Sequence, residues 1–409
     1  MIHIFTITAR NYLSLAITLG DSLAVHHPEA KFTIFVADGL GGVDEQNIPH
    51  ALKDVTTLLG TNLIDDLPFK YNITEFCTSV KPLIFQHLLA SEPDTSLVYY
   101  IDPDIYLYSR LDVITESTPE KTLYLAPHLI DCKVIDDNPY PEYHHLWEGI
   151  FNLGFCAVRR TSASEKILAW WHQRLVEYCY ADFKDGLHTD QKWMDYAPAY
   201  FEKDLQIVRN YGVNVAHWNL GERHISEKDG EIFSNTDRLV FFHFSGFDFR
   251  KGLLSKHSTE DRQAQHLHGT LAHVITTYRQ KVIDNGYDKY LSIPYAYAKY
   301  DNGLPITSFH RRLYRAWSAE EKISSPESSS GVFYRRLEAK GLIDKSNQAS
   351  SNYSAATVSN LDKKITQVEK ALRILLKLAG PGRYVQFTKL FSRIGRFENH
   401  AFLLRDKEK

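Results

Sequence analysis

The opening segment of the chain predicts a strand, a helix and a second strand joined by short turns. Residues 2–7 and 32–37 are short runs rich in β-branched and aromatic side chains, which is typical of buried strands. Between them, residues 11–25 carry leucines at helical spacing. A unit of this kind places its two strands in one sheet, parallel to each other. The sequence therefore predicts an α/β fold on an open sheet, in which ligands bind beyond the carboxyl ends of strands.

Further elements continue this alternation to about residue 255. The sequence predicts strands over 97–101, 122–126, 151–158, 205–208 and 239–244. It predicts helices over 80–91, 162–180 and 259–284. We expect a first domain over 1–257, a helical and aromatic extension over 258–323, linker and mobile segments over 324–360, and basic C-terminal helices over 361–409. The expected fold class is thus α/β with a helical C-terminal extension.

Two carboxylates interrupt the apolar strand that ends near residue 101. Asp102 and Asp104 flank Pro103 inside a run of aromatic and β-branched side chains. An unpaired charge buried in a strand costs several kcal/mol, so the strand must end here and something positive should neutralise the pair. Proline turns the chain, which lets both carboxylates converge on one point. The pair suits a hard divalent cation, Mn²⁺ or Mg²⁺. A solvated turn at the strand end is the simpler alternative.

A third ligand candidate is a histidine at the end of a later strand. His243 falls within the predicted strand over 239–244, and Gly246 follows, where the missing side chain would let a phosphate approach the backbone. Asp38 also follows a predicted strand, so Asp38, Asp102 and His243 are all expected beyond the carboxyl ends of strands. A cation held there would neutralise a diphosphate and activate it as a leaving group.

Composition and charge bear on several function classes. The net charge of −3 argues against general binding of nucleic acid. The four cysteines lack metal-type spacing and fit reduced thiols. The sequence has no run of 18 apolar residues, and Met1 leads directly into a strand-like pattern without a basic leader. We therefore expect a cytoplasmic protein.

The last 48 residues are basic and amphipathic. Residues 362–409 hold 12 Lys and Arg against 5 Asp and Glu, and apolar side chains recur at helical spacing. Such a segment can lie on an anionic membrane surface, which would make the protein peripheral on the inner face of the cell membrane. The alternative is a helix pair that packs on the body of the protein or on a second subunit of a homo-oligomer. Another basic cluster, Arg311, Arg312 and Arg315, is expected to form a solvated helix face.

Several short stretches, in order along residues 1–255, together resemble a known family. They are Phe5–Tyr12, Lys81, Asp102–Asp104, Asn152–Phe155, Thr189–Gln191 and His243–Gly246. Each motif is short, but the ordered set is similar to the GT-A-type glycosyltransferases, and within them to the retaining family 8 enzymes and related bacterial transferases.

The resemblance implies a GT-A fold, which is a Rossmann-like mixed sheet flanked by helices. It implies metal-dependent transfer, with retention, of a hexose-type sugar from a nucleotide diphosphate sugar, UDP-linked, to a hydroxyl of a glycan acceptor, as in bacterial surface polysaccharide synthesis. It assigns Mn²⁺ or Mg²⁺ to Asp102, Asp104 and His243, and catalytic roles to Gln191 and Asp190. The donor-binding residues that it implies are Thr8, Asn11, Asp38, Lys81, Asn152, Gly154 and Gly246.

The sequence departs from the family pattern at two places. Ala9 and Arg10 stand where the family often has an acid near the nucleoside base. Phe249 replaces a family lysine, so Arg250 or Lys251 would have to make the phosphate contact instead.

Other functions remain to be weighed against a transferase. A haloacid-dehalogenase-like phosphatase would carry its paired acids after the first strand, and a nicotinamide-dependent dehydrogenase would need a G-x-G-x-x-G turn. Neither pattern is present in the sequence. A non-catalytic scaffold of the same fold stays open. The acceptor also has two candidates, a lipid-linked glycan and a protein or soluble glycan. His144 and His145 are expected in a loop that faces it.

Overall fold

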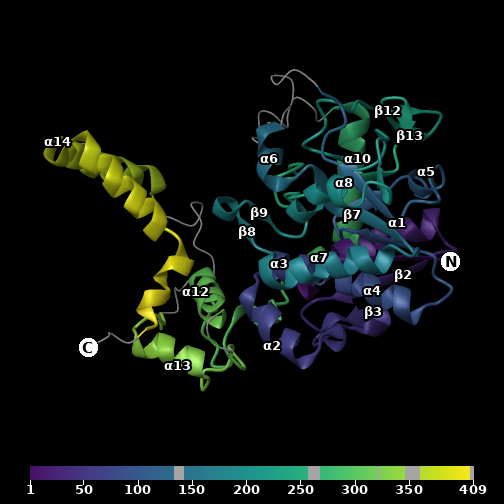
Figure 1. Ribbon diagram of the computed structural model, residues 1–409. Coiled ribbons are helices and arrows are strands. Elements are labelled where there is room, and N and C mark those ends of the chain that lie inside the picture. Colours follow the sequence, from purple (N-terminus) through teal and green to yellow (C-terminus); the bar gives the residue numbers. More distant parts are fainter. Residues whose placement is uncertain (133–141, 257–267, 320, 322, 346–359, 406–409) are drawn as a thin grey trace. The chain divides into compact units, whose positions relative to one another are not determined.

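A computed structural model describes residues 1–132, 142–256, 268–319, 321, 323–345 and 360–405 (Figure 1). The chain forms two compact units. The sheet unit comprises Met1–Leu59 and Ile73–Tyr295, and the helical unit comprises Gly60–Asn72 and Ala296–Lys409. The domain boundaries expected near residues 257, 323 and 360 stay predictions, whereas the compact units divide the chain after residues 59, 72 and 295.

The sheet unit is built on a seven-stranded sheet of order β10-β6-β7-β4-β1-β2-β3. Its strands are β1 (Ile2–Thr8), β2 (Lys31–Val36), β3 (Ala51–Asp54), β4 (Leu97–Ile101), β6 (Leu123–Pro127), β7 (Phe151–Arg159) and β10 (Leu205–Ile207). Strands β3, β2, β1 and β4 run parallel, and β7 runs antiparallel to both β4 and β6. The prediction of a mixed sheet in an α/β fold is therefore confirmed.

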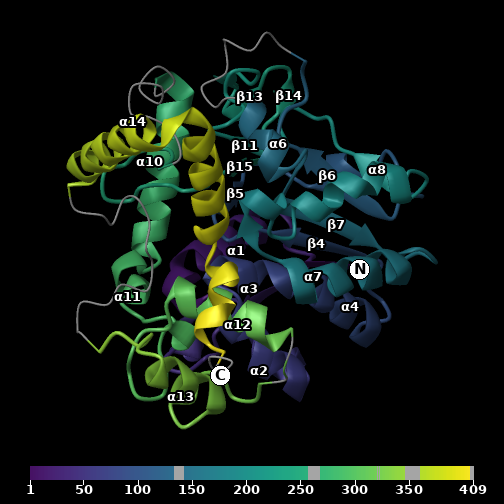
Figure 2. The same ribbon diagram turned by 60° about the vertical axis from the view of Figure 1, so that its left-hand side comes forward.

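Helices cover both faces of this sheet (Figures 1 and 2). Successive strand residues point to opposite faces. Ile4 of β1 packs with Leu19 of α1 (Leu13–His26), whereas the next residue, Phe5, meets Phe85 of α4 (Lys81–Ser91) at 4.9 Å between ring centroids. Phe85 in turn contacts Trp171 of α7 (Ser164–Tyr178). Helix α1 thus lies on one face, and α4 and α7 lie on the other.

The proline between the two acids moves the chain from this sheet into a second one. Strand β4 ends at Ile101, and β5 (Ile105–Leu107) pairs antiparallel with β15 (Phe241–His243) in a three-stranded sheet that also contains β11 (Val215–Ala216). In this register His243 lies opposite Ile105. Asp102 and Asp104 therefore lie at the crossing between the sheets, next to His243.

Smaller elements complete the sheet unit. They are α3 (Ile73–Ser79), α5 (Asp112–Thr115), α6 (His145–Glu148), α8 (Ala197–Tyr200), α10 (Gly269–Asp284), α11 (Tyr287–Leu291), the hairpin β8–β9 (Ala181–Asp182 and Leu187–His188) and the sheet β12–β13–β14 (Ile225–Lys228, Glu231–Ser234 and Asp237–Arg238). Helix α10 confirms the later part of the helix predicted over 259–284, and residues 259–267 lie outside the described residues.

The helical unit has an aromatic core of its own. It contains α2 (Thr61–Lys70), α12 (Ser308–Ser318), α13 (Val332–Ala339), α14 (Leu361–Ile394) and a 3₁₀ helix at Phe397–Leu403. Phe69 packs edge-on against both Tyr314 and Phe333 at 5.0 and 5.7 Å between centroids. Helix α13 forms within the stretch expected as linker, because its side chains Phe333, Tyr334 and Leu337 join this core. Residues 346–359 of that stretch lie outside the described residues.

The prediction of a solvated arginine face is wrong for Arg311. This residue is buried on α12, and its guanidinium donates to the backbone carbonyls of Pro68, Phe69 and Tyr71. These carbonyls are at the end of α2, where helix carbonyls have no partner within the helix. Arg311 therefore joins α2 to α12 through hydrogen bonds and is a structural residue.

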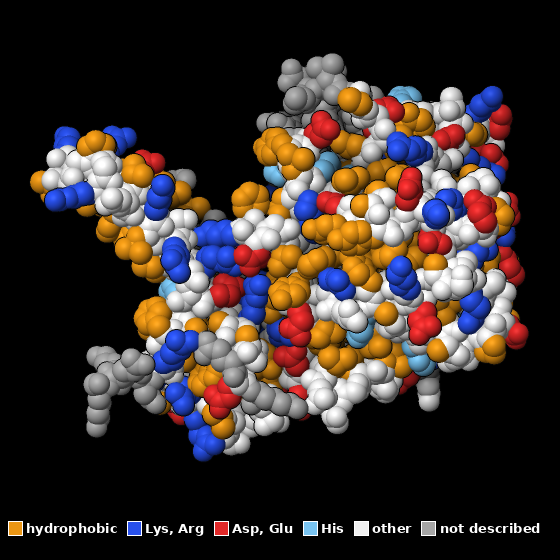
Figure 3. Space-filling model, viewed as in Figure 1, with side chains coloured by type: hydrophobic (Ala, Val, Ile, Leu, Met, Phe, Trp, Pro, Cys, Tyr) orange, Lys and Arg blue, Asp and Glu red, His pale blue; other side chains and the backbone are white. Residues whose placement is uncertain are grey.

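Helix α14 is the predicted basic amphipathic segment. Gly380 breaks it with a φ of 74°, which separates two helical stretches. Its apolar side chains are largely exposed, with Leu378 83% and Phe391 56% accessible. Figure 3 shows Lys and Arg side chains beside them. Every helix among the described residues is too short or too polar to cross a bilayer.

Candidate functional site

The predicted ligands converge at one edge of the large sheet. Strands β1, β2 and β4 are parallel, so the residues that follow them, including Asp38 and Asp102, lie at the same edge. Strand β7 runs the other way, so its first residues, Asn152 to Gly154, begin at this edge. The backbone N–H of Asp102 donates to the Gly154 carbonyl at 2.7 Å, which fixes the start of β7 beside the acids.

Asp102, Asp104 and His243 form a compact group. The Nε2 atom of His243 lies 3.2 Å from Oδ1 of Asp104 and 3.7 Å from Oδ2 of Asp102. The candidate ligand atoms of the three residues all lie within 4.8 Å of one another. Adjacent ligands of an octahedral Mg²⁺ or Mn²⁺ stand about 3 Å apart. The spacing and the oxygen-rich donor set therefore fit a divalent cation.

The other ring nitrogen of His243 faces amide oxygens. Nδ1 lies 3.2 Å from Oδ1 of Asn152 and 3.4 Å from Oδ1 of Asn214. An oxygen acceptor requires that Nδ1 carry the proton, so in the neutral ring the lone pair of Nε2 faces the carboxylates. This is the tautomer that a metal-binding histidine needs, held by the kind of outer hydrogen bond that such histidines usually make.

The protein compensates the negative charge of this group only in part: the positive charge of Lys81 acts on Asp102 from a distance, and the Tyr100 hydroxyl donates to Asp102. Among the described residues, His243 is the ion-pair partner of both carboxylates. Burial raises the pKa of the Asp102 carboxyl above its ordinary value. Burial by itself would lower the pKa of His243, but the carboxylates of Asp104 and Asp102 outweigh it and raise that pKa. Excess negative charge in a half-buried site is a condition that a cation relieves.

Gly154 leaves the space in which this group sits. A Cβ at this position would overlap the ring of His243 and stand 2.8 Å from Oδ2 of Asp102 and 2.9 Å from Oδ1 of Asn152. Glycine is therefore required here for close approach, whereas Gly246 is a glycine with a φ of 69°, as its turn after β15 demands.

Lys81 and Asp190 form a buried ion pair beside the three ligands. The Nζ atom of Lys81 lies 2.5 Å from Oδ2 of Asp190, 2.8 Å from the Leu153 carbonyl and 4.0 Å from the ring centroid of Tyr100. Burial opposes the charge of Lys81, but Asp190 and Asp102 outweigh it and raise the pKa of the ammonium. The carboxylate of Asp190 therefore holds the ammonium of Lys81 in place.

Gln191 is held by backbone groups on both sides. Its Oε1 accepts from the Leu153 N–H at 3.1 Å, and its Nε2 donates to the Glu148 carbonyl at 2.8 Å. The Asn152 Nδ2 also donates to Oε1 at 3.4 Å. The residues predicted for the sugar, Asn152, Asp190 and Gln191, are thus brought together by these contacts.

The predicted donor residues on β1 and β2 lie at the same edge. Asp38 accepts from the Arg10 backbone N–H at 2.9 Å and pairs with its guanidinium at 3.2 Å. Arg10 also donates to the carbonyls of Gly41 and Pro294. The arginine that departs from the family pattern therefore ties three loops together. Thr8 is buried and donates to the Ala9 carbonyl, whereas Asn11 has a buried Oδ1 with no partner among the described residues.

The second departure, Phe249, has a structural explanation. Phe249 is buried and packs against Tyr287 at 4.4 Å between centroids, so it belongs to the core. Asp248 accepts from the backbone N–H groups of Arg250 and Lys251, which fixes the turn that carries both basic residues. A phosphate contact from either of them stays a prediction.

Sequence reasoning missed two residues that contact the predicted ligands. Asn214 has a φ of 61° and places its amide beside His243, and His128 follows β6 directly and contacts Asn152. A polar residue two positions after the strand predicted over 122–126 was the available signal for His128. His128, His145 and Glu148 form a second group whose ligand atoms lie within 4.8 Å of one another.

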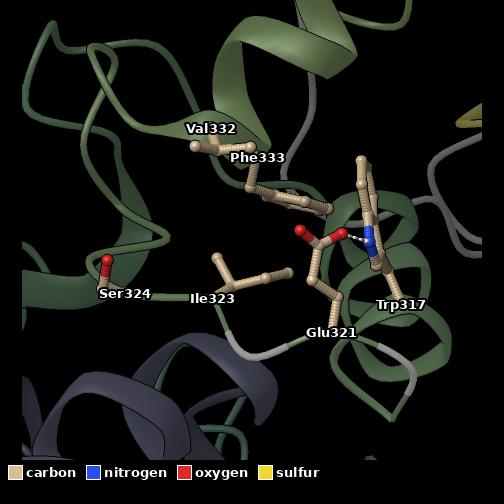
Figure 4. Close-up of a pocket in the computed structure, with 6 residues that line it drawn as sticks. All are labelled: Trp317, Glu321, Ile323, Ser324, Val332 and Phe333. Atoms are coloured by element: carbon tan, nitrogen blue, oxygen red, sulfur yellow. Dashed lines mark hydrogen bonds between the residues drawn. The ribbon is translucent and has the colours of Figure 1, made fainter.

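A separate pocket lies in the helical unit (Figure 4). It is lined by Trp317, Glu321, Ile323, Ser324, Val332 and Phe333. The only carboxylate that lines it, that of Glu321, accepts from the Trp317 indole N–H at 2.9 Å. Because this carboxylate is already hydrogen-bonded, the pocket offers fewer groups that could bind a ligand or take part in catalysis than the sheet edge does.

Comparison with known proteins finds relatives in Bacillus subtilis (strain 168). No protein-family model matches the chain. It is 32% identical over 175 residues to the uncharacterized protein YfnF, which covers 42% of this chain and 57% of YfnF. The chain thus matches little more than half the length of that relative. It is 25% identical over 252 residues to the uncharacterized protein YfnD, covering 60% of this chain and 78% of YfnD.

Solved structures that the chain resembles include glycosyltransferases. One is involved in glycosylation of the major capsid of PBCV-1 (13% identity, 59% of this chain and 91% of that chain, TM-score 0.35). Another is the galactosyltransferase LgtC in complex with donor and acceptor sugar analogs (18% identity, 52% and 75%, TM-score 0.33). A third is GlyE of Streptococcus pneumoniae TIGR4 (12% identity, 73% and 66%, TM-score 0.35).

Proposed function

We propose that this chain is a metal-dependent GT-A-type glycosyltransferase that transfers a sugar from a nucleotide diphosphate sugar to a hydroxyl of a glycan. The observation that carries the proposal is the meeting of Asp102, Asp104 and the Nε2 atom of His243 at the carboxyl edge of the sheet. The ordered motifs of the sequence support it, because the residues that they assign to the metal and to the sugar lie in one contact network.

The three ligand residues would hold Mn²⁺ or Mg²⁺ against the donor diphosphate. A bound divalent cation supplies charge stabilisation for the departing phosphate. Asn152 and Asn214 keep the tautomer of His243. Gly246 has no side chain, which would let a phosphate oxygen approach its backbone, and Arg250 or Lys251 is the candidate for a further phosphate contact.

The sugar would contact Asp190 and Gln191, and neither residue is well suited to be a nucleophile. The Asp190 carboxylate is committed to Lys81, and Gln191 is an amide held by the backbone. A double displacement needs a carboxylate close to the reacting carbon. This arrangement therefore favours substitution on one face of the sugar with retention, in which the acceptor hydroxyl attacks while its proton passes to the departing phosphate.

We favour a lipid-linked glycan as the acceptor, on the cytoplasmic face of a bacterial membrane. Helix α14 supports this, because it combines exposed apolar side chains such as Leu378 with many Lys and Arg residues. The expected result is sedimentation with vesicles that contain anionic lipid and loss of sedimentation in high salt. A dimer in solution with no vesicle binding would instead favour the homo-oligomer, and a protein or soluble acceptor.

A screen of nucleotide sugars tests the function directly. We expect one donor, UDP-linked, to be hydrolysed slowly when Mn²⁺ is present and to stabilise the protein against heat. A ligand at a hundred times its dissociation constant stabilises by about 2.7 kcal/mol. Hydrolysis that persists in EDTA would contradict the metal site. Binding of donor and metal without turnover for any acceptor would favour the non-catalytic scaffold.

A further inference from the structure

His128 is a buried histidine beside the candidate metal site, and the function proposed above does not use it. It follows β6 directly and is 3% exposed. Its ring stacks on His145 at 4.4 Å between centroids and meets Trp218 edge-on at 5.4 Å. Its Nδ1 atom lies 3.3 Å from the Ile150 carbonyl, and its Nε2 atom lies 3.4 Å from Nδ2 of Asn152.

Backbone groups at both ends fix the direction of every hydrogen bond in this chain of residues. The Leu153 N–H requires an oxygen on Gln191, so Oε1 of Gln191 is the atom that faces Asn152. Asn152 must therefore turn its NH₂ group toward Gln191 and His128, and its Oδ1 toward Nδ1 of His243. A flipped Asn152 amide would place two oxygens against each other.

The same logic sets the tautomer of His128. Its Nε2 accepts from the Asn152 NH₂ group, and its Nδ1–H donates to the Ile150 carbonyl. Burial and the neighbouring His145 lower the pKa of His128 to about 3, so the ring is neutral at physiological pH. A protonated ring would present a second donor to the Asn152 NH₂ group and would disrupt the arrangement.

We propose that His128 is a positioning residue for the metal ligand His243 and acts through Asn152. By accepting from Asn152, it helps to hold the amide orientation that keeps the proton of His243 on Nδ1 and the Nε2 lone pair toward the cation. The proposal rests on the metal site of the proposed function. A cation held by His128, His145 and Glu148 is the competing explanation of this cluster, but both ring nitrogens of His128 are already engaged.

Mn²⁺ binding to the full chain tests this role without any need for activity. We expect one Mn²⁺ per wild-type chain, measured by calorimetry and by the electron spin resonance signal of free Mn²⁺. His128→Phe keeps a ring for stacking and removes the acceptor, so the dissociation constant should rise about 10- to 100-fold, as for outer-shell partners of metal ligands. His128→Gln can accept through its Oε1 and should bind Mn²⁺ close to the wild-type value.

A matched control separates this effect from a general loss of stability. His310 is a buried, hydrogen-bonded histidine of the helical unit. His310→Phe should lower the free energy of unfolding and leave Mn²⁺ affinity unchanged. If His128→Phe does not fold, His128→Leu removes the same acceptor with a smaller side chain.

Each other outcome has a definite meaning. Wild-type Mn²⁺ affinity in the folded His128→Phe and His128→Leu proteins would overturn the positioning role and leave the metal site intact. Two Mn²⁺ per wild-type chain, with one lost in His128→Phe, would show that His128 is itself a ligand. No Mn²⁺ binding by the wild type would refute the metal site, and the positioning role with it.

Discussion

Two neighbouring groups of charged side chains, one buried and one half-buried, differ in how they are neutralised. Asp190 has a cation within the protein, because Lys81 lies 2.5 Å from its carboxylate. Asp102 and Asp104 have a histidine as their ion-pair partner among the described residues, and the charge of Lys81 acts on Asp102 only from a distance. Both groups lie at the same edge of the sheet. Among the described residues, Lys81 forms no ion pair with Asp102 or Asp104. The first group is thus neutral in itself, whereas the second keeps an excess of negative charge.

This difference separates a scaffold from a binding site. A buried charge without compensation is costly, so a protein that keeps one gains from a ligand of opposite charge. The Lys81–Asp190 pair needs no ligand and holds Leu153 at the start of β7 through its carbonyl. The Asp102–Asp104 pair should therefore respond strongly to metal, and the Lys81–Asp190 pair should respond to mutation as a structural unit.

The largest expected effect is on activity when a metal ligand is removed. Asp102→Asn keeps the shape of the side chain and removes one charge, so we expect turnover of a nucleotide sugar to fall by a factor on the order of 10³. EDTA should abolish wild-type turnover, and Mn²⁺ should restore it. The measurement is release of the nucleoside diphosphate by the folded proteins.

A surface acid provides the control for this substitution. Asp112 lies in α5 and pairs with Arg110, away from the ligands. Asp112→Asn should keep wild-type turnover and its metal dependence. Wild-type turnover in Asp102→Asn would contradict the assignment of the charge-deficient group as the metal site.

The next effect is on stability and has opposite expectations for the two groups. Asp190→Asn leaves the Lys81 ammonium buried without its partner, which should lower the free energy of unfolding by about 3 kcal/mol. Asp102→Asn removes like-charge repulsion and should be neutral or stabilising without metal. Urea unfolding in EDTA measures both. Equal destabilisation by the two substitutions would show that the two groups are compensated alike.

Gly154→Ala should affect the group of Asp102, Asp104 and His243 through one added atom. The new Cβ would press on His243 and stand 2.8 Å from Asp102. Overpacking of this kind costs about 2 kcal/mol and should also weaken Mn²⁺ binding. Gly186→Ala is the control. Gly186 has a φ of 65° and open space around it, so this substitution strains the backbone of a turn without any overpacking. Unchanged Mn²⁺ affinity in Gly154→Ala would mean that the ligands have room that the structure does not indicate.

The sequence predicted the charge-deficient group better than the neutral one. Asp102, Asp104 and His243 each follow or end a strand, and parallel topology brings strand ends to one edge, so local patterns were sufficient. The contact between Lys81 and Asp190 joins residues 109 positions apart and depends on how α4 packs against the sheet. No local pattern carries that information.

Arg311 is a second residue whose role depends on contacts that are distant in the sequence. Its neighbours on α12 suggested an exposed basic face, but its partners are carbonyls more than 240 residues earlier in α2. The sequence predicted that the strand ends and turns at Pro103, but not that β5 joins a second sheet, because its partner β15 lies more than 130 residues later in the chain. Residue type predicted which positions carry chemistry, and tertiary packing decided which of them are structural.

Glu92 extends the comparison to a carboxylate that is compensated near the surface. Its carboxylate accepts hydrogen bonds from His3, Lys31 and Thr95. Burial raises the pKa of Glu92, but these contacts outweigh it and lower the pKa from 4.5 to about 2. A carboxylate whose pKa is lower in the folded state than in the unfolded state stabilises the folded protein at pH values above its unfolded pKa. The contribution of Glu92 to stability is therefore present above pH 4.5 and is lost as the pH falls toward 2. Solvent screening limits it to about 1 kcal/mol.

Glu92→Gln should therefore lower the free energy of unfolding by this amount at pH 7, and the difference from wild type should shrink in urea titrations at pH 4 and pH 3. A difference that stayed constant with pH would show that the charge of Glu92 contributes nothing, and that compensation matters for stability only in the buried groups.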